Sequence, residues 1–272
     1  MTSFQSRLLV ALVGVPVLLY IVLLAPEWAL VLSLAALSGI AAYELSRCVG
    51  VLQVSPALFA LTVLWAVGTV MAIAYRFSWL PPLLTVYCLL AFTIAVVRGG
   101  AVKFQHVCAA LLAAFAIPYA FSSFLHIQTA GHRGFLLLPL VFSFASDTCA
   151  YFAGRAFGRH KLAPKVSPNK TVEGAIGGLV GDAAAGAVFA LVMNTWFDRS
   201  VHYLPVMVLG FLCSAVAQLG DLTFSLIKRE FGVKDYGKLF LAHGGVLDRF
   251  DSVIFVAPTL AVLLGLLKGG GA

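Results

Sequence analysis

The sequence predicts an all-α polytopic membrane protein, and three observations support this fold class. Of the 272 residues, 61% are hydrophobic and only 11% are charged, whereas soluble chains carry about 25% charged residues. Apolar runs recur along the whole chain, and each is long enough to cross a hydrocarbon core of about 30 Å. The alternation of apolar and polar residues that is typical of a membrane β-barrel is missing. A soluble globular domain is therefore excluded.

Hydropathy predicts about nine transmembrane helices. They cover residues 8–25, 28–46, 56–75, 80–97, 105–125, 134–152, 173–195, 204–227 and 246–267. The first run has a basic start but no small-residue cleavage site with a polar segment after it, so we interpret it as a retained span. Pro26, Pro81, Pro82 and Pro205 lie at span ends, where proline is tolerated.

The distribution of Lys and Arg predicts the orientation. With a cytoplasmic N-terminus, 14 of the 18 basic residues lie on the cytoplasmic side, and only Arg76, Arg133, Arg199 and Lys268 lie on the other. This excess predicts that the N-terminus is cytoplasmic and the C-terminus is on the opposite side. The long loops 153–172 and 228–245 then face the cytoplasm, where we expect the active site. The net charge of +7 fits such loops and contact with anionic lipid, not nucleic acid.

Acidic residues inside the spans predict a metal site. Asp147 and Asp221 lie about 8 and 9 Å before the cytoplasmic ends of their spans, and Asp248 and Asp251 lie in the first turns of the last span. Carboxylates delivered by separate helices to a similar depth suit a hard divalent cation. Polar contacts between helices remain the alternative for Asp147 and Asp221 and are the favoured interpretation of Asp182. For Glu44, a structural role in pairing with Arg47 or with a neighbouring span and a functional role both remain open.

The two long loops contain residues suited to phosphate groups. His243, Gly244 and Gly245 precede the last span, where glycines and free N–H groups of a helix N-terminus can accommodate a phosphate. In the other loop, Asn169 and Thr171 can cap the seventh span, with Glu173 in its first turn. Both loops are basic, although an orientation signal alone would also explain this. Together these features suggest phosphoryl or nucleotidyl transfer to a lipid; no GxxxxGK[ST] loop is present.

Several motifs with fixed spacing resemble phosphatidate cytidylyltransferases. They are Asp147-x-x-Ala150-Tyr151-x-x-Gly154-Arg155-x-Phe157-Gly158, Ser167-Pro168-x-Lys170-Thr171-x-Glu173-Gly174, Gln218-x-Gly220-Asp221, Ser225-x-Ile227-Lys228-Arg229, Lys234-Asp235-x-Gly237 and His243-Gly244-Gly245-x-x-Asp248-Arg249-x-Asp251. The family usually has Pro or Gly two residues before the histidine, whereas this chain has Leu241, followed by Ala242. The N-terminal half resembles the family only in its apolar character.

The resemblance implies transfer of CMP from CTP to phosphatidic acid, giving CDP-diacylglycerol and pyrophosphate, in a homodimer that requires Mg²⁺ and allows a second, monovalent cation such as K⁺. It implies catalytic roles for Asp221, Asp248, Lys228, Arg249 and His243. It implies substrate-binding roles for Lys170, Arg155, Ser167, Thr171, Glu173, Ser225, Arg229, Lys234, Asp235, Gly244 and Gly245. The expected metal ligands are Asp221, Asp248, Asp251 and Asp147.

These expectations divide the chain at residue 130. Residues 1–130 would form a transmembrane scaffold that faces lipid and offers dimer contacts, and residues 131–272 would form the catalytic region, in a bacterial inner membrane. Two other functions remain open. A CTP-dependent polyprenol or phytol kinase would transfer the γ-phosphoryl group and release CDP. A cation-coupled transporter would explain intramembrane acids by ion binding, with carboxylates near mid-membrane.

Overall fold

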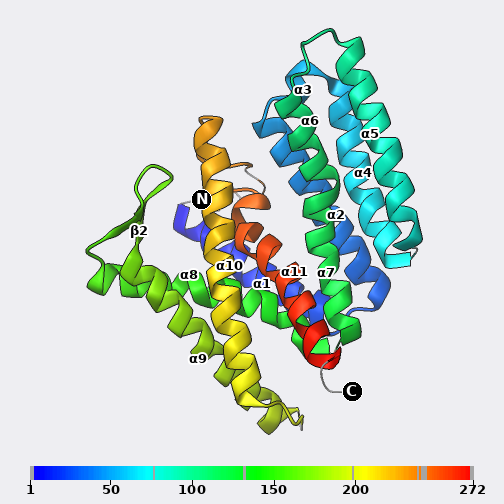
Figure 1. Cartoon of the computed structure of the whole chain (residues 1–272). Helices are drawn as coiled ribbons and strands as arrows, with labels where there is room; N and C mark the ends of the chain where they lie inside the picture. Colours follow the sequence, from blue (N-terminus) through cyan, green and yellow to red (C-terminus); the bar gives the residue numbers. More distant parts are fainter. Residues whose placement is uncertain are drawn as a thin grey trace. The chain divides into compact units, whose positions relative to one another are not determined.

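The structure, a computed structural model, describes residues 3–75, 77–130, 133–197, 199–237, 239 and 244–269. Its elements are almost all helices (Figure 1). Arg76, Lys238, Leu241, Ala242 and His243 lie outside the described residues, as do the side chains of Arg7 and Lys268. The elements are α1 (Ser3–Leu23), α2 (Glu27–Cys48), α3 (Val51–Val54), α4 (Pro56–Tyr75), η1 (Phe77–Trp79), α5 (Leu80–Val97), α6 (Phe104–Leu111), η2 (Leu112–Ala116), α7 (Ile117–Ala130), η3 (Arg133–Leu137), α8 (Leu138–Phe157), β1 (Lys161–Ala163), β2 (Ser167–Thr171), α9 (Val172–Trp196), α10 (Tyr203–Glu230) and α11 (Leu247–Gly269).

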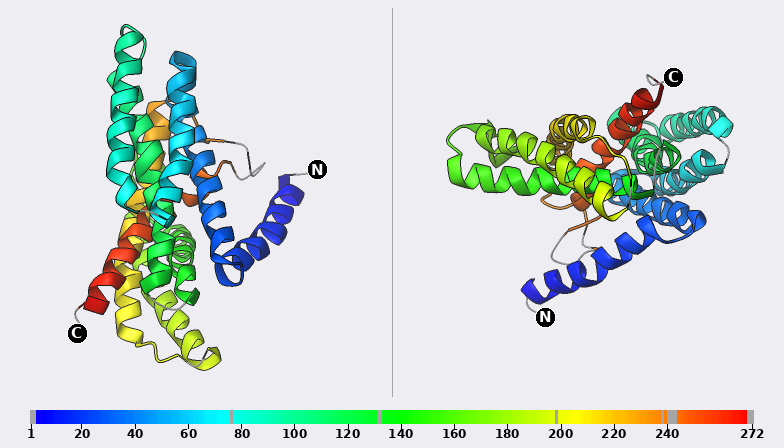
Figure 2. Two further views of the ribbon diagram at one scale, coloured as in Figure 1. Left: turned by 90° about the vertical axis from the view of Figure 1, so that its right-hand side faces the viewer. Right: turned by 90° about the horizontal axis from the view of Figure 1, so that it is seen from below.

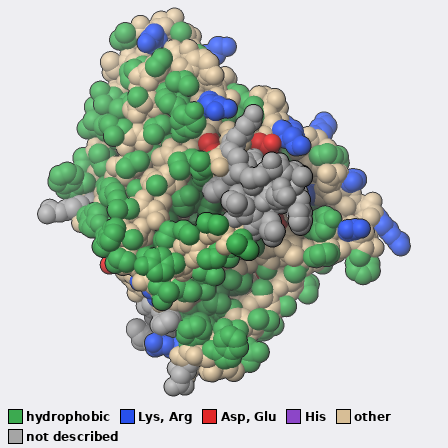
Figure 3. Space-filling view, turned by 180° about the vertical axis from the view of Figure 1, so that it is seen from behind, with side chains coloured by type: hydrophobic (Ala, Val, Ile, Leu, Met, Phe, Trp, Pro, Cys, Tyr) green, Lys and Arg blue, Asp and Glu red, His purple; other side chains and the backbone are tan. Residues whose placement is uncertain are grey.

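The predicted all-α polytopic fold is confirmed. Within the described residues, eight helical segments are long and apolar enough to cross a membrane, and a shorter apolar stretch, Leu12–Leu23, lies in α1. One of the eight, Phe104–Thr129, runs through the π-helical turn η2 without a break. Hydrophobic side chains cover much of the face drawn in Figure 3, as expected for helices in contact with lipid.

The chain forms two compact units. The first contains residues 1–125 and 230–250, and the second contains residues 126–229 and 251–272. The division into scaffold and catalytic region at residue 130 stays a prediction; by contacts, the polar segment 230–250 groups with the N-terminal helices. Backbone N–H groups at the end of this segment bond to Glu44 of α2, which is the local reason for the grouping.

The first unit has a core in which polar side chains bond across helices. Tyr87 of α5 is fully buried, and its ring contacts those of Trp65 and Phe115. Its hydroxyl lies 2.8 Å from the hydroxyl of Thr62 on α4. Thr69 donates to the carbonyl of Ala114 at 2.9 Å. Such bonds hold transmembrane helices together where water is absent.

In the second unit, α8 and α9 run side by side (Figures 1 and 2). Gly177 and Gly181 of α9 face Ala153 and Cys149 of α8 so closely that a Cβ atom at either glycine would overlap its neighbour. Small residues at this spacing let two helices approach closely in a membrane. Asp182, also on α9, is fully buried.

A β-hairpin joins α8 to α9. Strands β1 and β2 are antiparallel, with Lys161 opposite Thr171 and Ala163 opposite Ser167. The sequence predicts a long loop over residues 153–172 and no strands, because hydropathy does not detect strands this short. The hairpin brings the residues of β2 over the adjacent helices, where they form part of a pocket.

Candidate active site

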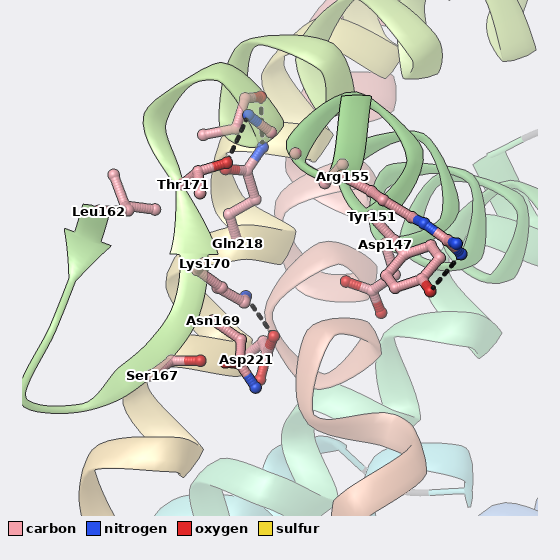
Figure 4. A pocket seen from close by; sticks show the side chains of 14 residues that line it. Asp147, Tyr151, Arg155, Leu162, Ser167, Asn169, Lys170, Thr171, Gln218 and Asp221 are labelled. Atoms are coloured by element: carbon pink, nitrogen blue, oxygen red, sulfur yellow. Dashed lines mark hydrogen bonds and ion pairs between the residues drawn. The ribbon is translucent and has the colours of Figure 1, made fainter. Parts of the chain in front are cut away.

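The second unit contains a pocket of about 560 Å³ between the hairpin and three helices (Figure 4). Its volume lies within the range of roughly 300–1,000 Å³ that is usual for small-molecule sites. The lining residues come from α8, both strands, the start of α9, and α10. They are Asp147, Ala150, Tyr151, Gly154, Arg155, Leu162, Ser167, Asn169, Lys170, Thr171, Gly174, Ala175, Gln218 and Asp221.

Lys170 of β2 and Asp221 of α10 form an ion pair in this pocket (Figure 4). The two side chains are 25% and 23% exposed, so solutes can reach both. Asp221 Oδ1 also accepts a hydrogen bond from Ser225 Oγ at 3.2 Å. Partly exposed ion pairs contribute only about 0–1 kcal/mol. Both charges can therefore exchange partners at little cost.

Two further carboxylates lie near Asp221. Asp147 lines the pocket from α8. Asp251 of α11 is 9% exposed and lies close enough to Asp221, Asp147 and Lys228 to interact electrostatically with all three. The structure thus places Asp251 near both Asp221 and Asp147, which are three of the four carboxylates that the depth argument groups. The negative charges of Asp221 and Asp147 beside Asp251 favour the binding of a cation.

The donors fit a magnesium ion that binds together with its substrate. Within the described ranges, no group of three or more His, Cys, Asp or Glu side chains could hold a metal ion. Mg²⁺ commonly uses only one or two carboxylates and completes its shell with water and substrate phosphates. The oxygen donors of Asp221 and Asp251 suit that arrangement. The ligand roles of all four aspartates, Asp147, Asp221, Asp248 and Asp251, stay predictions, and Asp248 belongs to the first unit.

Local hydrogen bonds hold the hairpin in place. Thr171 Oγ1 accepts from Gly174 N at 3.1 Å, so the predicted capping role of Thr171 is confirmed. Asn169 instead lies in β2 and lines the pocket. Glu173 accepts from the backbone N–H groups of Arg159 and His160 at 3.1 and 3.2 Å, and one of its oxygens lies 2.6 Å from His160 Nδ1. Glu173 is thus engaged with the chain itself.

The basic residues predicted to bind phosphate lie at different places around the pocket. Lys170 and Arg155 line it, and Arg155 Nη1 lies 3.4 Å from the hydroxyl of Tyr151. Arg229, at the end of α10, donates from Nε to the carbonyl of Val166 in the hairpin turn at 3.4 Å. Among the predicted polar groups, Ser167 also faces the pocket.

In the first unit, carboxylates accept hydrogen bonds from the backbone N–H groups at the start of α11. Asp248 Oδ2 accepts from Tyr236 N at 2.8 Å and from Gly245 N at 2.9 Å. The N–H groups of Val246 and Leu247 donate to Glu44. A phosphate at Gly244 and Gly245 would therefore need other donors, and this role stays a prediction. Lys234, Asp235 and Arg249 are exposed, and the predicted catalytic His243 is outside the described residues.

Three pocket residues had no predicted substrate-binding role. Tyr151, Asn169 and Gln218 line the pocket, and Gln218 Nε2 donates to the carbonyl of Ala175 at 3.0 Å. The polar stripe of Gln218, Asp221, Ser225 and Lys228 along one helix face contains the signal for Gln218. Asn169 has no comparable signal, because its position depends on the strand.

Comparison with known proteins gives consistent results. A model of the cytidylyltransferase family matches residues 5–267. A phosphatidate cytidylyltransferase of Bacillus subtilis (strain 168) is 32% identical over 280 residues, covering 98% of this chain and 100% of the relative. One of Staphylococcus saprophyticus is 41% identical over 150 residues, 54% of this chain and 56% of the relative. One of Staphylococcus aureus (strain COL) is 42% identical over 130 residues, 48% of each chain.

Proposed function

Because the chain belongs to the cytidylyltransferase family, we propose that it transfers CMP from CTP to phosphatidic acid, giving CDP-diacylglycerol and pyrophosphate. The relative from Bacillus subtilis, which aligns over its full length, is named phosphatidate cytidylyltransferase. The observation in the structure that best supports this function is the pocket in which Lys170 and Asp221 face each other. A nucleoside triphosphate with its metal ion needs a cationic side chain for the phosphates and a carboxylate for the metal ion.

The pocket residues suit the two kinds of charge in the substrates. Lys170 and Arg155 are placed to bind phosphate oxygens, and Ser167 and Asn169 offer neutral hydrogen-bonding groups beside them. When the substrates bind, Lys170 moves from Asp221 to a phosphate group, and the released carboxylate of Asp221 is then available to a cation. The weak ion pair between partly exposed groups permits this exchange.

Asp221 and Asp251 are the residues that would hold Mg²⁺. When bound, the ion would supply charge neutralisation for the triphosphate and for the leaving pyrophosphate. Asp147 lines the same pocket and adds negative charge near the cation. Asp248, one helical turn before Asp251 on α11, keeps its predicted ligand role as part of this proposal. A second, monovalent cation is compatible with the excess of carboxylates.

The reaction itself is a direct displacement. An oxygen of the lipid phosphate attacks the α-phosphorus of CTP, and a new P–O bond forms there. The bond from the α-phosphorus to the oxygen that bridges it to the β-phosphorus breaks, and this oxygen leaves with pyrophosphate. The protein aligns the two phosphates and reduces their repulsion, which is most of what phosphoryl chemistry requires.

The chain is an integral membrane protein, and we place it in the inner membrane of a bacterium with this pocket facing the cytoplasm. The Lys and Arg count and the bacterial relatives support this orientation and location. A homodimer remains a prediction, as do substrate contacts of Lys234, Asp235, Arg249 and His243. The two alternative functions, a CTP-dependent lipid kinase and a cation-coupled transporter, are not favoured, because the relatives are named as cytidylyltransferases.

The test uses the position of a radioactive label. Purified protein is incubated with phosphatidic acid, Mg²⁺ and CTP labelled at the α-phosphate, and in parallel with CTP labelled at the γ-phosphate. Cytidylyl transfer puts the α-label in the lipid and the γ-label in pyrophosphate. A kinase would put the γ-label in the lipid, and label that stays in CTP in both reactions would contradict any transfer.

A further inference from the structure

Glu44 of α2 has a buried side chain whose carboxylate bonds to a distant part of the chain. It is 3% exposed. Its Oε1 accepts from Val246 N at 3.0 Å, and its Oε2 accepts from Leu247 N at 2.9 Å. The first of these bonds joins residues 202 positions apart in the sequence. Both donors lie at the start of α11, where N–H groups have no partner within the helix.

Two glycines surround this carboxylate. A Cβ atom added to Gly237 or to Gly245 would overlap the carboxylate of Glu44. Since no larger residue fits at either position without movement, the backbone on both sides of the turn is in contact with Glu44. The two hydrogen bonds and the close packing of both glycines hold the Glu44 carboxylate at this position.

A second carboxylate fixes the same turn. Asp248 Oδ2 accepts from Tyr236 N and Gly245 N, and Gly244 has a φ of +83°, the left-handed region that favours glycine. We call Tyr236, Gly237 and Gly244–Leu247 the entry turn of α11. The carboxylate of Glu44, on α2, accepts from the N–H groups at the end of this turn. The carboxylate of Asp248, on α11, accepts from one N–H group on each side of the turn. Negative charge is also favourable at this end of a helix.

We propose that Glu44 is a positioning residue for the transfer reaction: it sets where α11 begins and thereby where the carboxylate of Asp248 is held. This inference rests on the proposed role of Asp248 in the reaction. Glu44 itself touches neither substrate nor metal in this account. Its effect passes through Val246 and Leu247, the two residues immediately before Asp248. The N-terminal helices are then more than a scaffold, because α2 supplies a residue on which the reaction depends.

The test compares Glu44→Gln with Glu27→Gln, which removes the same charge from an exposed position on the same helix. Glutamine presents one acceptor and one donor, so one of the two N–H groups loses its partner. We expect Glu44→Gln to lower kcat and to raise the Mg²⁺ concentration for half-maximal activity, each by about 10–100-fold, as for residues that support metal ligands. Glu27→Gln should match the wild type in both. Hydrogen exchange at Val246 and Leu247 should become faster only in Glu44→Gln.

Gly237→Ala provides a second, independent variant, because its methyl group would displace the Glu44 carboxylate. Gly265→Ala on α11, where a Cβ meets nothing within 4 Å, is its control. We expect Gly237→Ala to reproduce the Glu44→Gln phenotype and the double variant to lose no more than either alone. If Glu44→Gln does not fold, the comparison of Gly237→Ala with Gly265→Ala decides the question.

The outcomes separate positioning from a purely structural role. Faster exchange at the entry turn with unchanged kcat and an unchanged Mg²⁺ requirement would overturn the proposal, since Glu44 would then only stabilise the fold. Unchanged exchange would overturn it as well. Failure of the proposed function is distinguishable, because it would leave the wild type unable to transfer the α-label while the exchange difference at Val246 and Leu247 remained.

Discussion

Asp221 and Glu44 are both carboxylates on long apolar helices, yet their surroundings differ in a way that separates their roles. Asp221 is 23% exposed and pairs with a flexible side chain, Lys170. Glu44 is 3% exposed and accepts two backbone N–H groups. A lysine side chain can rotate to another anion, whereas backbone donors move only if the chain refolds locally. Asp221 can therefore exchange its partner when substrates bind, as we propose, whereas Glu44 cannot do so without local refolding.

The largest effect is expected for Asp221→Asn. Loss of the charge removes both the partner of Lys170 and a proposed ligand of the cation, so CMP transfer should fall on the order of 1,000-fold. Glu230→Gln, exposed at the end of the same helix, should retain wild-type activity. Transfer of α-label from CTP to lipid measures both. An active Asp221→Asn protein would show that Asp221 takes no part in the reaction. The contrast between an exchangeable partner at Asp221 and fixed partners at Glu44 would then no longer explain function.

Lys170→Ala should have the next largest effect, a loss of roughly 100-fold in kcat/KM for CTP. The variant leaves the carboxylate of Asp221 without its cation and removes a phosphate-binding group from the pocket. Lys165→Ala, exposed in the turn of the same hairpin, is the matched control. Equal activity of the two variants would show that the ion pair serves no purpose in binding.

Thr171→Ala should have the smallest effect. Loss of its hydrogen bond to Gly174 N removes the cap of α9, which costs about 1 kcal/mol of stability. The apparent melting temperature in detergent should fall by roughly 2–4 °C, and CMP transfer should fall only a few-fold because Lys170 is the adjacent residue. A loss as large as that of Lys170→Ala would mean that Thr171 contacts substrate directly.

Most of the fold could be predicted from the sequence, because each span is an uninterrupted apolar stretch and needs no information from its neighbours. The cap at Thr171 was likewise predictable, since a cap and its helix are adjacent in sequence. The position of Asp251 near Asp147 and Asp221 agrees with the similar depths that the sequence predicts for them along separate spans. These features depend on local pattern or on the geometry of one helix.

The rest depends on contacts between distant segments. No pattern near Glu44 indicates that it bonds to Val246 and Leu247, and the glycines at 237 and 245 become informative only once that contact is known. The hairpin escaped prediction because β1 has three residues and β2 five. For the same reason the pairing of Lys170 with Asp221 could not be anticipated.

The most direct test of this account is a structure of the protein bound to Mn²⁺ and a CTP analogue with a methylene bridge between the α- and β-phosphates. We expect the triphosphate in the pocket, with Lys170 on a phosphate oxygen and the cation on Asp221. We also expect Glu44 still to accept hydrogen bonds from Val246 N and Leu247 N. A nucleotide outside the pocket, with the ion pair between Lys170 and Asp221 intact, would contradict it.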